Sequence, residues 1–199
     1  MQAARRIVES DGIDGLTMRR LAQKLQIAPM AIYRHVREKN EVLVLLLDDA
    51  YRELKPPRRS STPRARLTAL WKFLHAGLER YPWVVEAIVR SDLMAPSVLA
   101  QMEAILRSLV ECGLTAAQAG DAYRVIWQFT VGELILRSSA QKRLSNARPS
   151  MVVDTLLSVD VKAMPTLAQV ARYWFVPPRY LKYETGLKVI LDGLLTKPA

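Results

Sequence analysis

Two short amphipathic segments, separated by a three-residue break, constrain this chain more than any other feature of its sequence. The first follows Thr17, a good N-cap residue, and the second begins at Pro29, which suits the first position of a helix. Helical spacing places four apolar residues of the first segment on one stripe: Met18, Leu21, Ala22 and Leu25. In the second segment, Ile32 and Val36 take the inward positions. Residues 17–36 therefore fit a helix-turn-helix, in which the first helix braces the second.

Helical periodicity continues along the rest of the chain and predicts an all-α protein. The expected helices are Gln2–Ser10, Met18–Leu25, Pro29–Val36, Lys39–Leu54, Arg64–Arg80, Pro82–Ser91, Ala95–Cys112, Ala116–Lys142 and Arg179–Thr196, with a loop and one broken helix over residues 144–178. The segment 55–63 holds three prolines and no apolar stripe, so it is the clearest boundary. We expect residues 1–54 to form an N-terminal three-helix helix-turn-helix domain, 55–63 a linker and 64–199 a C-terminal helical domain.

The charge of the chain is unevenly distributed. It has 29 Lys and Arg against 19 Asp and Glu, a formal net charge of +10. Such an excess favours an anionic partner, either nucleic acid or an acidic membrane surface. Residues 1–66 carry +6 (14 − 8) and residues 67–199 carry +4 (15 − 11), so the partner surface is expected in the N-terminal third. A membrane-surface protein is the remote alternative, because the acidic side chains within Lys39–Leu54 would be repelled by anionic lipid.

Several functional classes are excluded by what the sequence lacks. The single cysteine, Cys112, rules out an internal disulfide and a Cys-rich zinc site, and His35 and His75 are too far apart for local metal-ligand spacing. The sequence has no Gly-x-Gly pair, so it contains no phosphate loop or dinucleotide fingerprint. We therefore expect neither an enzyme nor a cofactor. No uncharged apolar run approaches the roughly 18 residues of a membrane span, and no signal-peptide pattern opens the chain, which predicts a cytoplasmic protein.

The second segment offers side chains that suit contact with the edges of bases. With Ile32 and Val36 turned inward, the outer positions are Pro29, Met30, Ala31, Tyr33, Arg34 and His35. A helix of this kind fits the major groove of DNA, where Arg34 can give two hydrogen bonds to guanine. Lys39 opens the next helix, whose N-terminal amides favour a phosphate, and Arg19 lies in the first turn of the bracing helix.

These residues resemble the DNA-binding domain of TetR-family transcriptional repressors. The matching strings are Gly12-Ile13-Asp14-Gly15-Leu16-Thr17-Met18-Arg19-Arg20-Leu21-Ala22-Gln23-Lys24-Leu25, then Ile32-Tyr33-Arg34-His35-Val36, then Lys39. The resemblance implies a homodimer that binds a palindromic operator and releases it when a small ligand binds the C-terminal domain. By position it implies that the major groove is faced by Met18, Arg19, Pro29, Met30, Ala31, Tyr33 and Arg34. It also implies that phosphates are held by Thr17, Tyr33, His35 and Lys39.

Three features depart from the family pattern. Gln26 stands where the family usually has a glycine in the turn. Ala28 stands where a capping residue is common, so we expect the second helix to lack a side-chain cap. The chain also starts inside the segment that matches the family's first helix, so either its start is assigned late or that helix is short.

Two C-terminal segments are expected to form a dimer interface. The strings Cys112-Gly113-Leu114-Thr115, Phe129-Thr130-Val131-Gly132 and Tyr183-Glu184-Thr185-Gly186-Leu187 are similar to the tetracycline-repressor type of C-terminal domain. Apolar residues make up 10 of 16 positions in 121–136 and 9 of 16 in 180–195, on more than one face of each helix. Helices near 116–142 and 179–196 would bury both faces in a four-helix interface with their symmetry mates.

Aromatic and Met side chains from several C-terminal helices suit a hydrophobic inducer, although each could equally be an ordinary core residue. They are Trp71, His75, Trp83, Met94, Met102, Tyr123 and Trp127. The tetracycline-repressor group binds a metal-chelated drug, but His75 is the only histidine outside the operator-binding segment, so no metal site is expected. The sequence thus predicts a ligand-responsive repressor with a helix-turn-helix domain and a helical ligand-binding and dimerisation domain. A DNA-binding activator and a ligand-independent regulator are the alternatives.

Overall fold

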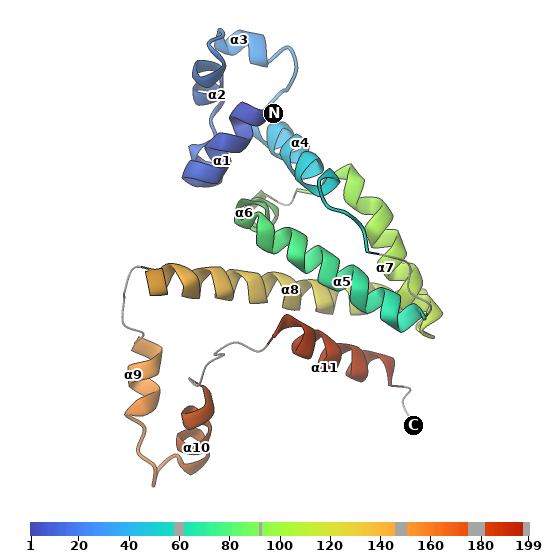
Figure 1. Cartoon of the computed structure of the whole chain (residues 1–199), viewed down its shortest axis with the longest axis vertical. Helices are drawn as coiled ribbons and strands as arrows, with labels where there is room; N and C mark the ends of the chain where they lie inside the picture. Colours follow the sequence, from blue (N-terminus) through green and yellow to red (C-terminus); the bar gives the residue numbers. More distant parts are fainter. Residues whose placement is uncertain (58–61, 92, 146–150, 175–181, 197–199) are drawn as a thin grey trace.

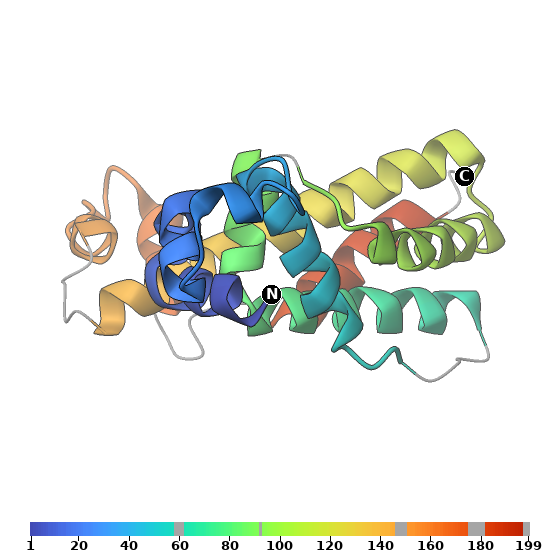
Figure 2. The same cartoon turned by 90° about the horizontal axis from the view of Figure 1, so that it is seen from above.

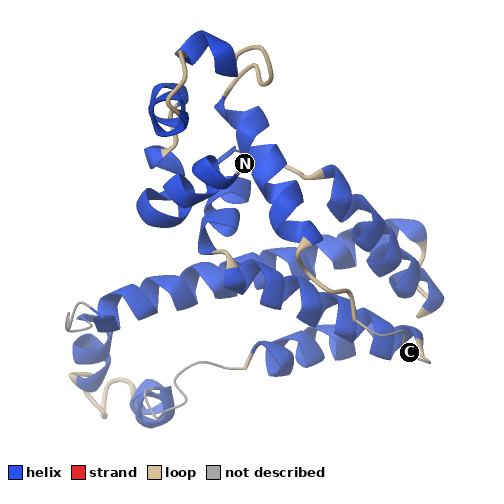
Figure 3. Cartoon of the chain, turned by 45° about the horizontal axis from the view of Figure 1, so that its top comes forward, coloured by secondary structure: helices blue, strands red, loops and turns tan. Residues whose placement is uncertain are grey.

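A computed structural model describes residues 1–57, 62–91, 93–145, 151–174 and 182–196. Within these ranges the chain folds into helices joined by turns and loops, and no strand occurs (Figures 1 and 3). The all-α prediction is therefore confirmed. Residues 58–61 of the expected linker and residues 179–181 of the last expected helix lie outside the described ranges.

The first helix bends at a glycine. Helix α1 (Gln2–Gly15) is interrupted at Gly12, whose φ of 70° and ψ of −179° are open to glycine but strained for other residues. The sequence predicted a helix over Gln2–Ser10 that ends near this glycine. The structure instead adds a further turn after the bend, which buries Ile13 and leads to the fully buried Leu16.

Helices α2 (Met18–Leu25) and α3 (Pro29–Ile32) form the expected pair of short helices, and α4 (Lys39–Arg52) follows them. Helix α3 is shorter than the predicted Pro29–Val36. The chain nevertheless stays coiled beyond it, because the amides of His35 and Val36 both donate to the carbonyl of Ile32 at 2.9 and 3.1 Å. One inward position was wrong: Leu25 is 45% exposed, because it is the last residue of α2 and the chain turns away after it.

The C-terminal part is a layered helical body. It contains α5 (Pro63–Arg80), α6 (Pro82–Ser91), the short 3-10 helix η1 (Pro96–Val98), α7 (Leu99–Glu111), α8 (Ala116–Ser145) and α11 (Tyr183–Leu195). Helix α5 packs on α7, α7 packs on α8, and α11 lies against both α5 and α8. Figure 2 shows these helices running along the long body on which the N-terminal helices sit.

The segment between α8 and α11 holds two helices where the sequence predicted one broken helix. Helix α9 (Met151–Leu157) and helix α10 (Pro165–Trp174) pack against each other. Pro165 is the first residue of α10, a position where a missing amide proton costs nothing, so it starts a new helix instead of breaking one. In Figure 1 this pair hangs from the end of α8, away from α1–α3.

A continuous hydrophobic core joins the two ends of the chain. It runs from α1 to α11 and includes the fully buried side chains of Leu16, Leu43, Trp71, Ile105 and Leu187. Helix α4 contributes to both ends, because it contacts α1 on one side and α6 and η1 on the other. A displacement of α6 or η1 therefore acts on α4 directly.

No single helix among the described residues is long and apolar enough to cross a membrane. Helices α6 and η1–α7 reach that length and composition only together, across a bend of 102°.

Candidate nucleic-acid interface and internal cavity

The start of α2 is held by its expected cap. The Oγ1 of Thr17 accepts a hydrogen bond from the amide of Arg20 at 3.1 Å. The guanidinium of Arg20 turns back to α1, where it donates to the carboxylate of Asp11 at 2.6 Å. Arg19, its neighbour, stays exposed at the outer end of α2. Arg20 therefore links α2 to α1, whereas the neighbouring Arg19 faces solvent.

The turn between α2 and α3 uses a strained residue. Gln26 has a φ of 57° and a ψ of 40°, the left-handed conformation that glycine adopts most easily. The turn is closed by the amide of Ile27, which donates to the carbonyl of Ala22 at 3.1 Å. Ala28 then begins α3 without a side-chain cap, as its small apolar side chain predicts.

Helix α3 and the turn that follows it pack one face against the core and expose the opposite face to solvent. Ile32 and Val36 are buried, with exposed fractions of 5% and 9%. Met30 is 74% exposed and Tyr33 46% exposed, and Arg34 and His35 are also exposed. The outer face of α3 can therefore approach another surface without any rearrangement of the core. Figure 3 shows α2 and α3 projecting from the rest of the chain.

The ten sequence-predicted contact residues lie at this projecting end, but they are not equally free. Thr17 already uses its hydroxyl as a cap, Met18 is half-buried against the core, and Ala31 and Lys39 are half-buried. The exposed members are Arg19, Pro29, Met30, Tyr33, Arg34 and His35. The prediction missed the exposed apolar side chains of Leu25 and Ile27 beside them, 45% and 43% exposed.

Three cations of this surface form no close ion pair with another described residue. None of the ion pairs between described residues involves Arg19, Arg34 or Lys39. Lys39 lies at the N-terminus of α4, where the amides of the first turn also attract an anion. These groups could bind a polyanion such as a phosphodiester backbone.

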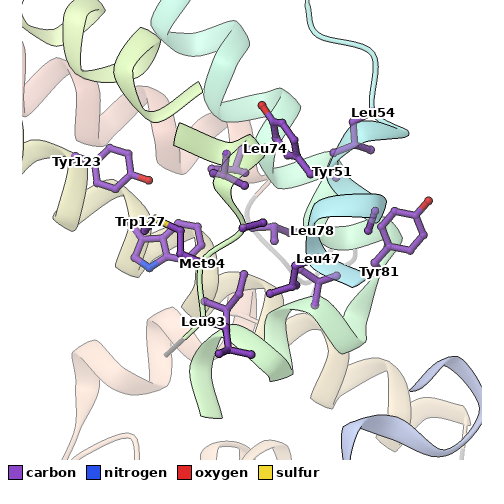
Figure 4. Close-up of a pocket in the computed structure, with 16 residues that line it drawn as sticks. Leu47, Tyr51, Leu54, Leu74, Leu78, Tyr81, Leu93, Met94, Tyr123 and Trp127 are labelled. Carbon is purple, nitrogen blue, oxygen red and sulfur yellow. The ribbon is translucent and has the colours of Figure 1, made fainter. Parts of the chain in front are cut away.

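A cavity of about 310 Å³ lies behind the N-terminal helices. Sixteen residues line it, from α4, α5, α6, α8 and the segment 93–98 (Figure 4). None of these sixteen side chains carries a charge. The lining side chains that carry a polar group are Tyr51, Tyr81, Tyr123 and Trp127, and burial raises the pKa of each of the three phenols. The cavity can therefore hold an uncharged, largely apolar molecule.

Three of the seven sequence-predicted ligand residues line this cavity: Met94, Tyr123 and Trp127 (Figure 4). The other four lie elsewhere. Trp71 is fully buried with its ring 5.3 Å from that of Tyr123, Trp83 is buried and 5% exposed, and Met102 is half-buried on α7.

The fourth, His75, belongs to a buried polar network. Its Nε2 lies 2.8 Å from Oε2 of Glu133, and its ring stacks on Tyr183 with the centroids 3.9 Å apart. The Tyr183 hydroxyl lies 2.9 Å from the Thr130 hydroxyl, and the Tyr183 ring also stacks on Phe129 at 5.5 Å. This network joins α5, α8 and α11, and none of its residues lines the cavity. No group of three or more His, Cys, Asp or Glu able to hold a metal ion occurs among the described residues.

The prediction missed the contribution of α4 to the cavity. Leu47, Ala50 and Tyr51 of α4 line it, with Leu54 just beyond the helix, and none of them is among the seven sequence-predicted ligand residues. The available signal was Tyr51, because an aromatic residue with a hydroxyl group at the end of an apolar stripe favours a site with a polar contact.

Two helices expose apolar side chains in this single chain. On α8 these are Val125, Ile135 and Leu136, which are 44%, 41% and 68% exposed, and on α11 Val189 is 64% exposed. The inward faces of the same helices pack on each other through Ile126, Leu187 and Leu191. Both helices are therefore apolar on two sides.

Comparison with known proteins finds one family model for each of two parts of the chain. A sequence model described as "Bacterial regulatory proteins, tetR family" matches residues 1–46, and one described as "Tetracyclin repressor-like, C-terminal domain" matches residues 56–197. The chain is 29% identical over 206 residues to the HTH-type transcriptional repressor DrrR1 of Streptomyces coeruleorubidus, covering 98% of this chain and 75% of that protein.

Solved structures share the fold over nearly the whole chain. The TetR family protein ActR of Streptomyces coelicolor, in complex with actinorhodin, superposes with a TM-score of 0.76 and 26% identity, covering 98% of this chain and 92% of ActR. BioQ with its double-stranded DNA operator superposes with a TM-score of 0.67 and 22% identity, covering 98% of this chain and 95% of BioQ.

Proposed function

The chain belongs to the TetR family of bacterial transcriptional regulators, which are DNA-binding proteins and not enzymes, and on this premise we propose how it acts. It is a homodimeric repressor of the cytoplasm that reads a palindromic operator through α3. It leaves the operator when a small, uncharged, apolar ligand fills the cavity. The observation that carries this proposal is the face of α3, anchored by Ile32 and Val36 and open at Tyr33 and Arg34.

The DNA contacts follow from exposure and chemistry. Arg34 gives two hydrogen bonds to a guanine, and the methyl group of Ala31 touches a thymine methyl. Tyr33, His35 and Lys39 hold phosphates, with the cap residue Thr17 beside them. The remaining predicted groove contacts, Met18, Arg19, Pro29 and Met30, complete the surface.

Dimerisation would bury the second apolar faces of α8 and α11. The exposed side chains of Leu136 and Val189 support this, because isolated chains gain about 25 cal/mol for each Å² of apolar surface that they bury. The two helices and their symmetry mates form a four-helix interface. Two copies of α3 about 34–36 Å apart then face successive major grooves, which requires an inverted repeat.

The ligand would be uncharged, because a charge placed among these sixteen side chains would lose its hydration without gaining a counter-ion. The cavity volume of about 310 Å³ suits a small molecule, at the lower end of the range of about 300–1,000 Å³ usual for such sites. ActR, solved in complex with actinorhodin, supports a ligand-binding role for a chain of this fold. To act as an inducer, the ligand must favour the DNA-free state by about 1–3 kcal/mol.

A gel shift on the DNA upstream of the protein's own gene tests the DNA-binding surface. We expect a specific, salt-sensitive complex that is lost or weakened at least tenfold in Arg34→Ala and Tyr33→Ala. The matched control is Arg107→Ala, which removes an exposed helical arginine on α7. Equal binding by Arg34→Ala, Tyr33→Ala and the control would contradict the proposal.

Sedimentation velocity tests the dimer. Val189→Glu places a charge on the outer face of α11, and we expect it to shift the protein to monomer. Val110→Glu is the control, because Val110 is similarly exposed, at 47%, but lies on α7. A wild-type monomer at micromolar concentration would contradict the dimeric reading.

A further inference from the structure

Tyr81 both lines the cavity and hydrogen-bonds to the end of α4. It lies at the junction of α5 and α6, where its ring lines the cavity and is only 7% exposed. In Figure 4 its hydroxyl points away from the opposite wall, where Trp127 and Met94 lie. That hydroxyl donates a hydrogen bond to Oε2 of Glu53 at 2.5 Å. One end of the side chain therefore faces the ligand space, and the other is fixed outside it.

Glu53 joins this tyrosine to the first helix. It is the C-cap residue of α4, and its carboxylate accepts two hydrogen bonds from the guanidinium of Arg5 in α1, one of them at 3.0 Å. The guanidinium carbon of Arg5 also lies 5.0 Å from the centre of the Tyr81 ring. Arg5, with the Tyr81 hydroxyl, lowers the pKa of Glu53 to about 2, so the carboxylate is ionised at neutral pH.

The other buried phenol contacts of the cavity do not reach α1. The Tyr51 hydroxyl donates to Oε1 of Gln101 at 2.7 Å, and the amide of Gln101 donates to the carbonyl of Leu70 at 3.2 Å. This chain of bonds stays among α4, α7 and α5. The ion pair of Asp14 in α1 with Arg90 in α6, at 2.9 Å, is exposed, and neither residue lines the cavity.

We propose that Tyr81 is the positioning residue through which the cavity controls the DNA-binding end of the protein, by way of Glu53 and Arg5. This rests on the proposed function, since it assigns the route by which the same ligand acts. An O–H···O hydrogen bond persists only between about 2.5 and 3.0 Å. A ligand that displaces the Tyr81 ring by about 1 Å therefore breaks the bond to Glu53. The pair of Glu53 and Arg5 then loses one of its fixed partners, which weakens one of the links between α1 and α4.

Amide hydrogen exchange of the full-length protein tests this route without DNA. Tyr81→Phe keeps the ring in the cavity wall and removes the hydroxyl, and Tyr51→Phe removes the matched hydroxyl that bonds to Gln101. We expect Tyr81→Phe to speed exchange in residues 2–11 about tenfold over wild type, because a hydrogen bond to a charged group is lost. Tyr51→Phe should leave these amides unchanged. Equal exchange of residues 2–11 in the two variants would overturn the proposal.

A second arm measures the response to an occupied cavity. The probe is N-phenyl-1-naphthylamine, a neutral fluorescent aromatic whose affinity is read from its own emission. We expect the wild type and Tyr51→Phe to exchange faster in residues 2–11 when saturated with the probe. Tyr81→Phe should bind the probe within threefold of wild type and show no further change. A purely structural tyrosine would leave this response intact, and a response retained in Tyr81→Phe, or absent from the probe-saturated wild type, refutes the route.

The two proposals fail in different ways. If the chain binds no operator, the proposed function fails while the exchange of residues 2–11 still reports on the link from Tyr81 to Arg5. If operator binding and ligand release are both found but the Tyr81→Phe variant releases DNA as the wild type does, only the route is wrong. Glu53→Gln provides a second variant, which should reproduce the faster exchange of residues 2–11.

Discussion

Gln26 offers the sharpest test of the backbone geometry that orients α3. Within the described residues it is the one non-glycine residue with positive φ, at 57°. Its left-handed conformation costs an L-residue roughly 1–2 kcal/mol, which Gln26→Gly removes. Glycine also raises the conformational entropy of the unfolded chain, which lowers the free energy of unfolding by about 0.4–1 kcal/mol. The difference predicts that Gln26→Gly stabilises the fold by about 1 kcal/mol, or about 2–4 °C in Tm for a chain of this size.

The matched control is the same chemical change three residues earlier. Gln23 is exposed and lies within α2, where glycine costs about 0.5–1 kcal/mol relative to a good helix former. Thermal unfolding followed by circular dichroism should therefore give a higher Tm for Gln26→Gly and a lower Tm for Gln23→Gly. Two shifts of the same sign and size would refute the argument that the turn is strained.

Three further predictions concern stability. Ala28→Ser should raise Tm by supplying the missing cap of α3, worth about 1 kcal/mol, and an unchanged Tm would contradict this. Gly186→Ala should lower the urea midpoint, because its new Cβ would lie 2.4 Å from Cζ of Phe129 and overpacking costs about 1–3 kcal/mol; Gly120→Ala, which meets open space, should raise it. Because the pKa of Glu53 is about 2 in the fold against an ordinary 4.5, its stabilising contribution is complete above pH 4.5 and is lost as the pH falls towards 2. Urea titrations across this range should show a shallower pH dependence for Glu53→Gln, and an unchanged dependence would contradict this.

The exposed face of α3 and of the turn that follows it was predictable, because it depends on the local spacing of apolar residues. The period that turned Ile32 and Val36 inward also turned Tyr33 and Arg34 outward, and all four lie as expected. The helical period also predicted that Leu25 is buried, and this was wrong. Periodicity does not show where a neighbouring helix stops covering the apolar stripe of α2. The turn at Gln26 was recognised only as a departure from the family pattern, and its left-handed geometry came from the structure.

The cavity was less predictable, because an apolar helix face looks the same in sequence whether it packs or lines a space. Met94 and Trp127 line the cavity, whereas Trp83, chosen on the same chemical grounds, is packed in the core. His75 was drawn from the same set and instead pairs with Glu133 on a distant helix, a contact of long sequence separation. The link from Tyr81 to Arg5 is likewise set by tertiary packing and has no signal in the local sequence.

Selection of bound duplexes from a random pool tests the central claim most directly. Two copies of α3 held by a symmetric dimer predict enrichment of an inverted repeat, with half-site centres about one helical turn, 10–10.5 base pairs, or a multiple of it apart. Arg34→Ala should lose its preference for guanine at one position in each half-site. Enrichment of a single unrepeated site, or of no sequence at all, would contradict the account.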